Sequence, residues 1–128
     1  MAAAETRPID VPTWLRTHYE LVDAGLLEEY LDDFAENVEL RFGALPPVRG
    51  KDAVRAALAR GHDAHAMSHE FVNVWEAGTT TIVEFAVTYT YPGGASRTTP
   101  VVTILAGQPG AIGSMRIFLD RTVHEGEA

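Results

Sequence analysis

The sequence of 128 residues contains no cysteine and a single lysine, Lys51. The absence of cysteine excludes disulfides, thiolate catalysis, iron–sulfur clusters and cysteine-based zinc sites. Nothing in the composition demands an oxidising compartment, so we expect a cytoplasmic protein. Schiff-base chemistry would have to use Lys51. No apolar run approaches the roughly 20 residues of a membrane-spanning helix, and the start of the chain lacks the apolar core of a secretory signal.

Positive charge is also scarce. The chain has 10 Lys and Arg against 18 Asp and Glu, which gives a net charge of −8 with neutral histidines. Nucleic acids and anionic membranes both require clustered basic residues, so we expect neither as a partner. Hydrophobic residues make up 46% of the chain, which is ordinary for a globular protein. We expect residues 1–128 to form one domain, with residues 1–9 as a flexible leader and residues 124–128 as a tail.

The first half of the chain predicts three helices around one short strand. Apolar residues recur with helical spacing over residues 12–25, 27–34 and 51–65. Residues 38–42 alternate between apolar and polar side chains, which predicts a strand. Residues 43–50 contain a Pro-Pro pair and predict a loop.

The second half of the chain predicts a sheet. Residues 68–76, 80–91, 97–106 and 114–120 are separated by short glycine-containing turns and are rich in β-branched and aromatic residues. Hairpin spacing of this kind makes consecutive strands antiparallel. The predicted fold is therefore of the α+β class, with three helices packed on one face of a curved antiparallel sheet.

This order of elements resembles the nuclear transport factor two-like superfamily, also called SnoaL-like domains or cystatin-like α+β cones. The resemblance spans roughly residues 14–120. It is carried by three segments, Val22-Asp23-Ala24-Gly25-Leu26-Leu27, Gly50-Lys51-Asp52-Ala53-Val54 and Gly113-Ser114-Met115-Arg116-Ile117-Phe118-Leu119-Asp120. It implies a cone in which the sheet and the helices enclose an apolar pocket. The superfamily includes ketosteroid isomerases, polyketide cyclases, scytalone dehydratases and limonene-epoxide hydrolases, and also non-catalytic binding domains.

No catalytic set of these enzymes is complete in the chain. For the ketosteroid isomerases, the oxyanion tyrosine falls at His18, the general base near Phe42 and the protonated acid at Val102. The acid of the polyketide cyclases and the Asp–Arg–Asp set of the epoxide hydrolases are also absent. Scytalone dehydratases place a histidine at the start of the second strand and an aspartate at the end of the first helix. His69 and Asp23 fit those two places.

Two histidines on apolar faces are the main candidates for chemistry. His18 lies in the middle of the apolar stripe of the first helix, where burial favours a neutral imidazole that can hydrogen-bond a ligand or shuttle a proton. By alternation, His69 shares one face of its strand with Phe71 and Trp75. The alternative for each is a structural histidine, held by neighbouring groups. Asp23 would be a weaker third member at the pocket mouth, or a solvated residue at a helix end.

The spacing of His62, His65 and His69 is compatible with a metal site. Three histidines can bind zinc and leave a coordination position open. The first two, however, fall late in a helix and the third in a strand, and no carboxylate accompanies them at a clear spacing. We therefore expect no metal and no other cofactor.

The rest of the predicted pocket is apolar or aromatic. The same side chains would equally make a filled core, and an enclosed void of at least about 300 Å³ beside either histidine would favour a ligand site. The predicted ligand contacts are Trp14, Phe34, Phe42, Leu58, Phe71, Phe85, Tyr89, Val102, Met115 and Ile117.

These patterns lead to two hypotheses about function. The first is a cofactor-independent enzyme that isomerises, cyclises or dehydrates an apolar cyclic or polyketide-like molecule by acid–base catalysis. In it, His69 is the base or acid and His18 donates a hydrogen bond to a carbonyl or hydroxyl group. The alternative is a non-catalytic domain that binds a ligand or forms a homodimer. The convex sheet face available for dimerisation would carry Ile82, Ala86, Thr88, Val101 and Thr103.

Overall fold

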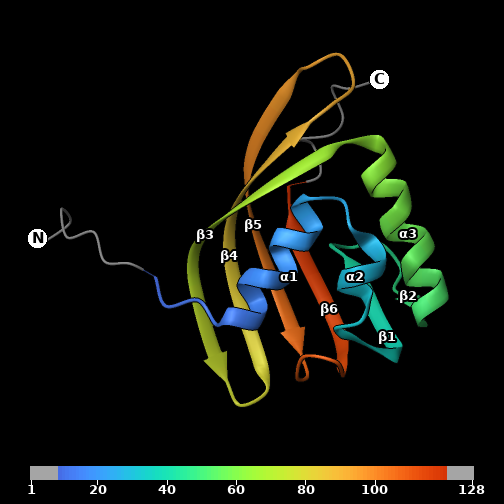
Figure 1. Cartoon of the computed structure of the whole chain (residues 1–128), viewed down its shortest axis with the longest axis vertical. Coiled ribbons are helices and arrows are strands. Elements are labelled where there is room, and N and C mark those ends of the chain that lie inside the picture. Colours follow the sequence, from blue (N-terminus) through green and yellow to red (C-terminus); the bar gives the residue numbers. More distant parts are fainter. Residues whose placement is uncertain (1–8, 121–128) are drawn as a thin grey trace, which may run out of the picture.

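The computed structural model describes residues 9–120 (Figure 1). The expected tail and, apart from Ile9, the expected leader lie outside these residues. No helix within them is of a length and apolar character that would let it span a membrane. In chain order the elements are α1 (Thr13–Asp23), α2 (Leu27–Leu31), β1 (Phe34–Phe42), β2 (Val48–Arg49), α3 (Lys51–Ala64), β3 (Ala66–Ala77), β4 (Thr80–Thr90), β5 (Ser96–Ala106) and β6 (Ile112–Leu119).

The six strands form one sheet in the order β2-β1-β6-β5-β4-β3. Strands β3 to β6 form the antiparallel meander that the sequence predicts. Strand β1, however, pairs with β6 in parallel, so the sheet is mixed and not purely antiparallel. The prediction missed this pairing because hairpin spacing concerns only strands that follow one another in the chain. Figure 1 shows all three helices on the same side of the curved sheet, so the predicted α+β architecture is confirmed.

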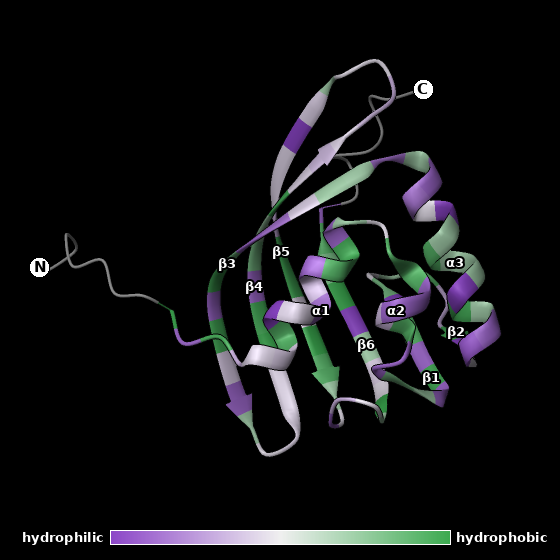
Figure 2. Cartoon of the chain, in the orientation of Figure 1, coloured by the Kyte–Doolittle hydropathy of each residue, from purple (hydrophilic) through white to green (hydrophobic). Residues whose placement is uncertain are grey.

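The core fills the space between the helices and the concave face of the sheet. Helix α1 buries Leu15, His18, Tyr19 and Val22, which recur with helical spacing. Alternate residues of β4, from Thr81 to Tyr89, are buried beneath it. Figure 2 shows hydrophobic residues along β4, β5 and β6, the strands that the helices cover. Gly25 has a φ of 74° and follows α1, so it supplies the left-handed turn that ends this helix.

The region between α2 and α3 differs from the prediction in two ways. Helix α2 ends at Leu31, and Phe34 begins β1, where it pairs with Ile112. The register of β1 shifts between Phe34 and Glu39, which hides the start of the strand from an alternation test. The predicted loop at residues 43–50 contains the short strand β2, in which Val48 pairs with Leu40.

The predicted orientation of β5 was wrong. Val101, Thr103 and Leu105 are buried on the concave face, and Val102 lies on the opposite face. The pairing of Val101 with Phe85 sets this register. Apolar residues occur at both the odd and the even positions of β5, so alternation alone does not show which set faces the core.

Strand β3 contains a bulge that reverses its alternation. The register with β4 shifts between Phe71 and Asn73, which leaves Val72 as the extra residue. Beyond it, Val74 packs against the core and Trp75 is 50% exposed. His69 and Phe71 therefore share a face as predicted, whereas Trp75 does not.

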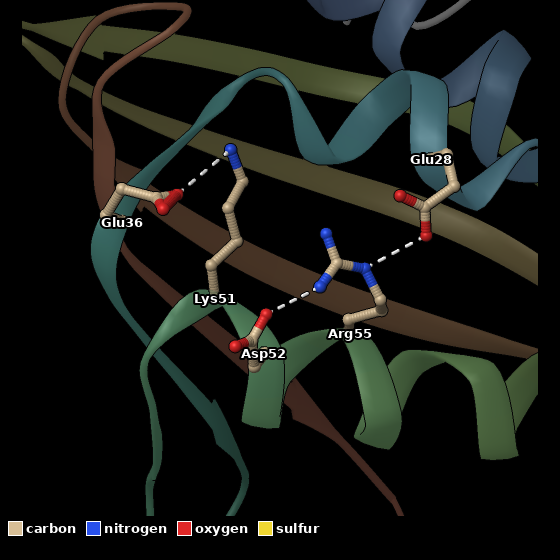
Figure 3. A network of polar contacts seen from close by, with 5 residues as sticks. All are labelled: Glu28, Glu36, Lys51, Asp52 and Arg55. Carbon is tan, nitrogen blue, oxygen red and sulfur yellow. Dashed lines mark hydrogen bonds and ion pairs between the residues drawn. The ribbon is translucent and has the colours of Figure 1, made fainter.

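Exposed ion pairs orient α3 relative to α2 and β1 (Figure 3). Arg55 Nε donates to Glu28 Oε2 of α2 at 2.9 Å, and its Nη1 donates to Asp52 Oδ1 at 2.7 Å. The hydrogen bond to Glu28, followed by the one to Asp52, raises the pKa of Arg55. Lys51 Nζ lies 3.6 Å from Glu36 Oε2 of β1. Water and salt screen such pairs, so each adds little to the free energy of unfolding.

Candidate functional site

A pocket of about 110 Å³ lies between the helices and the concave face of the sheet. Its volume is below the roughly 300–1,000 Å³ of ligand pockets in general, so the void that would favour a ligand site over a filled core is not reached. A cavity of about 150 Å³ binds benzene, so this smaller pocket has room for a short chain or for one end of a ring. The lining residues are mostly apolar and aromatic, and four of them are histidines.

The predicted ligand contacts divide between the pocket wall and other places. Five of them line the pocket, namely Phe42, Leu58, Tyr89, Met115 and Ile117. The other five do not. Phe34 and Phe85 are fully buried in the core, Trp14 and Phe71 pack against it partly exposed, and Val102 lies on the other face of the sheet.

His69 and Asp23 form a close pair at the pocket. His69 Nδ1 lies 2.6 Å from Asp23 Oδ1, and the His69 backbone N–H donates to Asp23 Oδ2 at 2.8 Å. The aspartate comes from the last residue of α1 and the histidine from the first half of β3. Two bonds to one carboxylate fix the imidazole both in position and in orientation. Asp23 is therefore not simply a solvated residue at a helix end.

His18 has an aspartate partner that the sequence did not reveal. Its Nδ1 lies 2.7 Å from Asp33 Oδ2, and the His18 side chain is only 1% exposed. Asp33 lies in the turn between α2 and β1. It belongs to an acidic stretch that is typical of a solvated helix flank, so its partnership with a buried histidine leaves no pattern in the sequence.

The two aspartates define which nitrogen of each ring carries a proton. A carboxylate only accepts hydrogen bonds, so Nδ1–H is the donor in both pairs. When the ring is neutral, its Nε2 is left with a lone pair, which can accept a hydrogen bond or a proton. Both His18 and His69 line the pocket. The arrangement therefore brings two oriented imidazoles to one apolar cavity.

Tyr19 lies between the two histidines. The centroid of its ring is 5.0 Å from that of His18 and 4.8 Å from that of His69. Burial raises the pKa of Tyr19 far above its ordinary value, and a hydrogen bond with Thr103 offsets this only in part. The phenol is therefore neutral, and its aromatic ring separates the two imidazoles.

A third imidazole, His62, is paired with Tyr30. The Tyr30 hydroxyl lies 2.7 Å from His62 Nε2, which joins α2 to α3 across the pocket wall. Burial raises the pKa of Tyr30 and lowers the pKa of His62, so both groups are neutral near pH 7. The sequence singled out neither member as part of this pair.

The three histidines with ligand-like spacing, His62, His65 and His69, all line the pocket. They nevertheless have different surroundings, since His62 bonds Tyr30, His65 packs edge-on against Tyr89 with centroids 4.8 Å apart, and His69 bonds Asp23. Within residues 9–120, no group of three or more His, Asp or Glu side chains is placed to hold a metal ion.

Comparison with known proteins adds a family and a set of similar structures. The model of the SnoaL-like domain matches residues 15–127. No curated protein matches the chain. The chain is similar to a proposed polyketide cyclase from Xanthomonas campestris pv. campestris, with 21% identity, a TM-score of 0.76 and coverage of 85% of this chain and 89% of that chain.

Two further solved structures share the fold. One is a protein of ketosteroid isomerase-like fold from Catenulispora acidiphila in complex with trimethylamine, with 13% identity, a TM-score of 0.79 and coverage of 89% and 90% of the two chains. The other is SalBIII, an epoxide hydrolase/cyclase-like enzyme with a role in pyran ring formation in the polyether salinomycin. It has 20% identity, a TM-score of 0.76 and coverage of 86% and 90%. At these identities the likeness concerns the fold.

Proposed function

The chain belongs to the family of SnoaL-like domains, and from this premise we propose that it is a cofactor-independent enzyme that moves protons on a small apolar molecule. The reaction would be an isomerisation, cyclisation or dehydration. The observation that carries the proposal is the pair of imidazoles at one apolar pocket, each held at Nδ1 by its own aspartate. Oriented imidazoles of this kind serve as general acids and bases near neutral pH.

The proposed reaction gives the two histidines different roles. A neutral His69 takes a proton at Nε2 from a carbon next to a carbonyl group, and the electron pair of that C–H bond moves to the carbonyl oxygen. His18 can donate to this oxygen only when its Nε2 is protonated, because Asp33 already occupies Nδ1–H. The reaction thus needs one neutral and one charged ring.

The pocket volume limits the part of the substrate that reacts inside. About 110 Å³ holds only the reactive end of a molecule, because a cavity that takes benzene has about 150 Å³. A polyketide-like substrate would therefore keep most of its length outside the pocket. SalBIII and the proposed polyketide cyclases support this class of chemistry as relatives in fold.

Proton abstraction can be tested without knowledge of the natural substrate. In D₂O, the wild-type protein should accelerate the exchange of the α-protons of cyclohexanone, a small ketone whose carbonyl end would enter the pocket while the rest of the ring stays at its mouth. The disappearance of the α-proton signals is followed by NMR, with the urea-unfolded protein as the control for free histidine side chains. A rate equal to that of the unfolded chain would contradict the proposal.

A second feature favours association of two copies through the convex face of the sheet. Trp75 and Phe118 are 50% and 43% exposed there. Cross-strand pairing places Ile82 beside Trp75 and Val102 beside Phe118. Of the five residues predicted for this face, Val101 and Thr103 instead lie on the concave side. A homodimer would cover these apolar side chains.

Light scattering tests the homodimer. At tens of micromolar protein, the wild type should have the mass of two chains, and Phe118→Glu should shift it toward one chain because the new carboxylates would be buried without partners. Thr98→Glu, near the end of the β4–β5 hairpin, should shift the mass less. A wild-type protein that scatters as a single chain would refute the homodimer.

A further inference from the structure

A second cavity lies outside the pocket and shares one residue with it. It is a groove of about 490 Å³ between the segment before α1, α1 itself and β3, the edge strand of the sheet. The shared residue is His69, which lines both the pocket and the groove. The lining residues of the groove are Ile9, Val11, Arg16, His69, Glu70 and Phe71.

Arg16 is the cationic group of this groove, and its guanidinium is held in place. The guanidinium carbon lies 5.5 Å from the centroid of the Phe71 ring, which is the distance of a cation–π contact. Arg16 forms no ion pair with a carboxylate in the part of the chain that the structure describes. A stacked guanidinium keeps its edge N–H groups available, and their fork matches the two oxygens of a carboxylate.

The acidic residues near Arg16 do not prevent its guanidinium from binding a carboxylate. Asp23 bonds His69 through both carboxylate oxygens, so its charge is engaged on the pocket side. Glu70 lines the groove and is the acidic residue that would oppose an anion. Its side chain projects from β3 with opposite parity to His69 and Phe71, and it is exposed to water, which weakens the repulsion.

We propose that the groove binds the carboxylate-bearing tail of a ligand whose apolar head occupies the pocket. The inference rests on the proposed function and extends it to the substrate class, a small apolar ring that bears an acidic side chain. The two volumes agree with this division, because about 110 Å³ admits one end of a ring and the groove of about 490 Å³ shares the lining residue His69 with the pocket. Arg16 is then a specificity residue that distinguishes acids from uncharged analogues of equal length.

The test compares two probes that differ only in the terminal group, 4-phenylbutyrate and 4-phenylbutan-1-ol. Titration calorimetry on the wild type should give a dissociation constant about tenfold or more lower for the acid, the effect of one charge-assisted bidentate contact. Arg16→Gln should remove this preference, and Arg16→Lys should keep part of it because the charge stays and the fork is lost. Glu70→Gln should tighten binding of the acid and leave the alcohol unchanged.

Arg60→Gln is the matched control, because it removes the same charge from an exposed position of α3 outside both cavities. Its preference for the acid should equal that of the wild type. Equal wild-type affinities for the two probes, or an equal loss in Arg16→Gln and Arg60→Gln, would overturn the groove subsite alone. If neither probe binds, the groove subsite is overturned. The cyclohexanone exchange rate then decides about the pocket: a normal rate restricts the failure to the groove, and a rate equal to that of the unfolded chain overturns the pocket as a ligand site too.

Discussion

Replacement of His69 by glutamine should slow the protein-catalysed exchange of cyclohexanone α-protons by about 10²–10⁴-fold. The amide of glutamine is similar in size to imidazole but has no basic nitrogen, so it cannot take the proton. Its N–H can still bond Asp23, which lies 2.6 Å from His69 Nδ1. The backbone bond from residue 69 to Asp23 Oδ2 is independent of the side chain. The loss should thus concern chemistry and not folding.

Three comparisons separate catalysis from structure. His18→Gln should also slow the exchange, because the oxygen of the probe loses its proton donor. Asp23→Asn should also slow the exchange, because a single amide oxygen cannot accept from both the His69 backbone N–H and its Nδ1–H, and the imidazole loses its fixed orientation. Thr88→Val, on the opposite face of the sheet, should leave the rate unchanged. Wild-type exchange in a folded His69→Gln protein would remove His69 from the proposed reaction.

The second large effect is expected at Gly107, in the turn between β5 and β6. Gly107→Ala should lower the free energy of unfolding by about 3 kcal/mol, the upper end of the cost of a strained backbone. The φ of Gly107 is 119°, which L side chains rarely adopt, and its added Cβ would lie 2.6 Å from the Ala111 carbonyl oxygen and 2.9 Å from Ile112 Cα. Both neighbours are backbone atoms, so no side chain can rotate away.

Gly110 provides the control within the same turn. Its φ is 87°, and an added Cβ would meet nothing within 4 Å. Gly110→Ala should therefore cost only about 1–2 kcal/mol, the penalty for a left-handed L residue. Urea unfolding of the two variants measures the difference as a shift in the midpoint. Equal midpoints would show that the contact with Ala111 is relieved by movement of the turn.

The sequence predicted the elements whose signals are local. The long strands of the meander and α3 were recognised because their apolar periodicity is continuous and their turns contain glycine. His18 was singled out by its place on the apolar face of α1, and the structure buries it. His69 is predicted by alternation on its strand as well as by resemblance, Asp23 mainly by resemblance, and the structure brings them within hydrogen-bond distance.

The missing parts depend on contacts between distant segments. Asp33 finds His18 only when the turn after α2 folds back over α1, and Tyr30 finds His62 only when α2 meets α3. The bulge at Val72 exists in the pairing with β4, so a period of two could not place Trp75. For β5, pairing with β4 determines which residues face the core, because both faces of β5 carry apolar residues and the alternation alone does not distinguish them.

The parallel pairing of β1 with β6 constrains the order in which the chain can fold. Residues 34–42 find their long sheet neighbour only in residues 112–119, nearly the last of the described structure. During synthesis on the ribosome, therefore, β1 and the helices around it cannot complete their packing on the sheet until β6 has been made. Because so many contacts join the two ends of the sequence, we expect folding to be slow for a protein of this size.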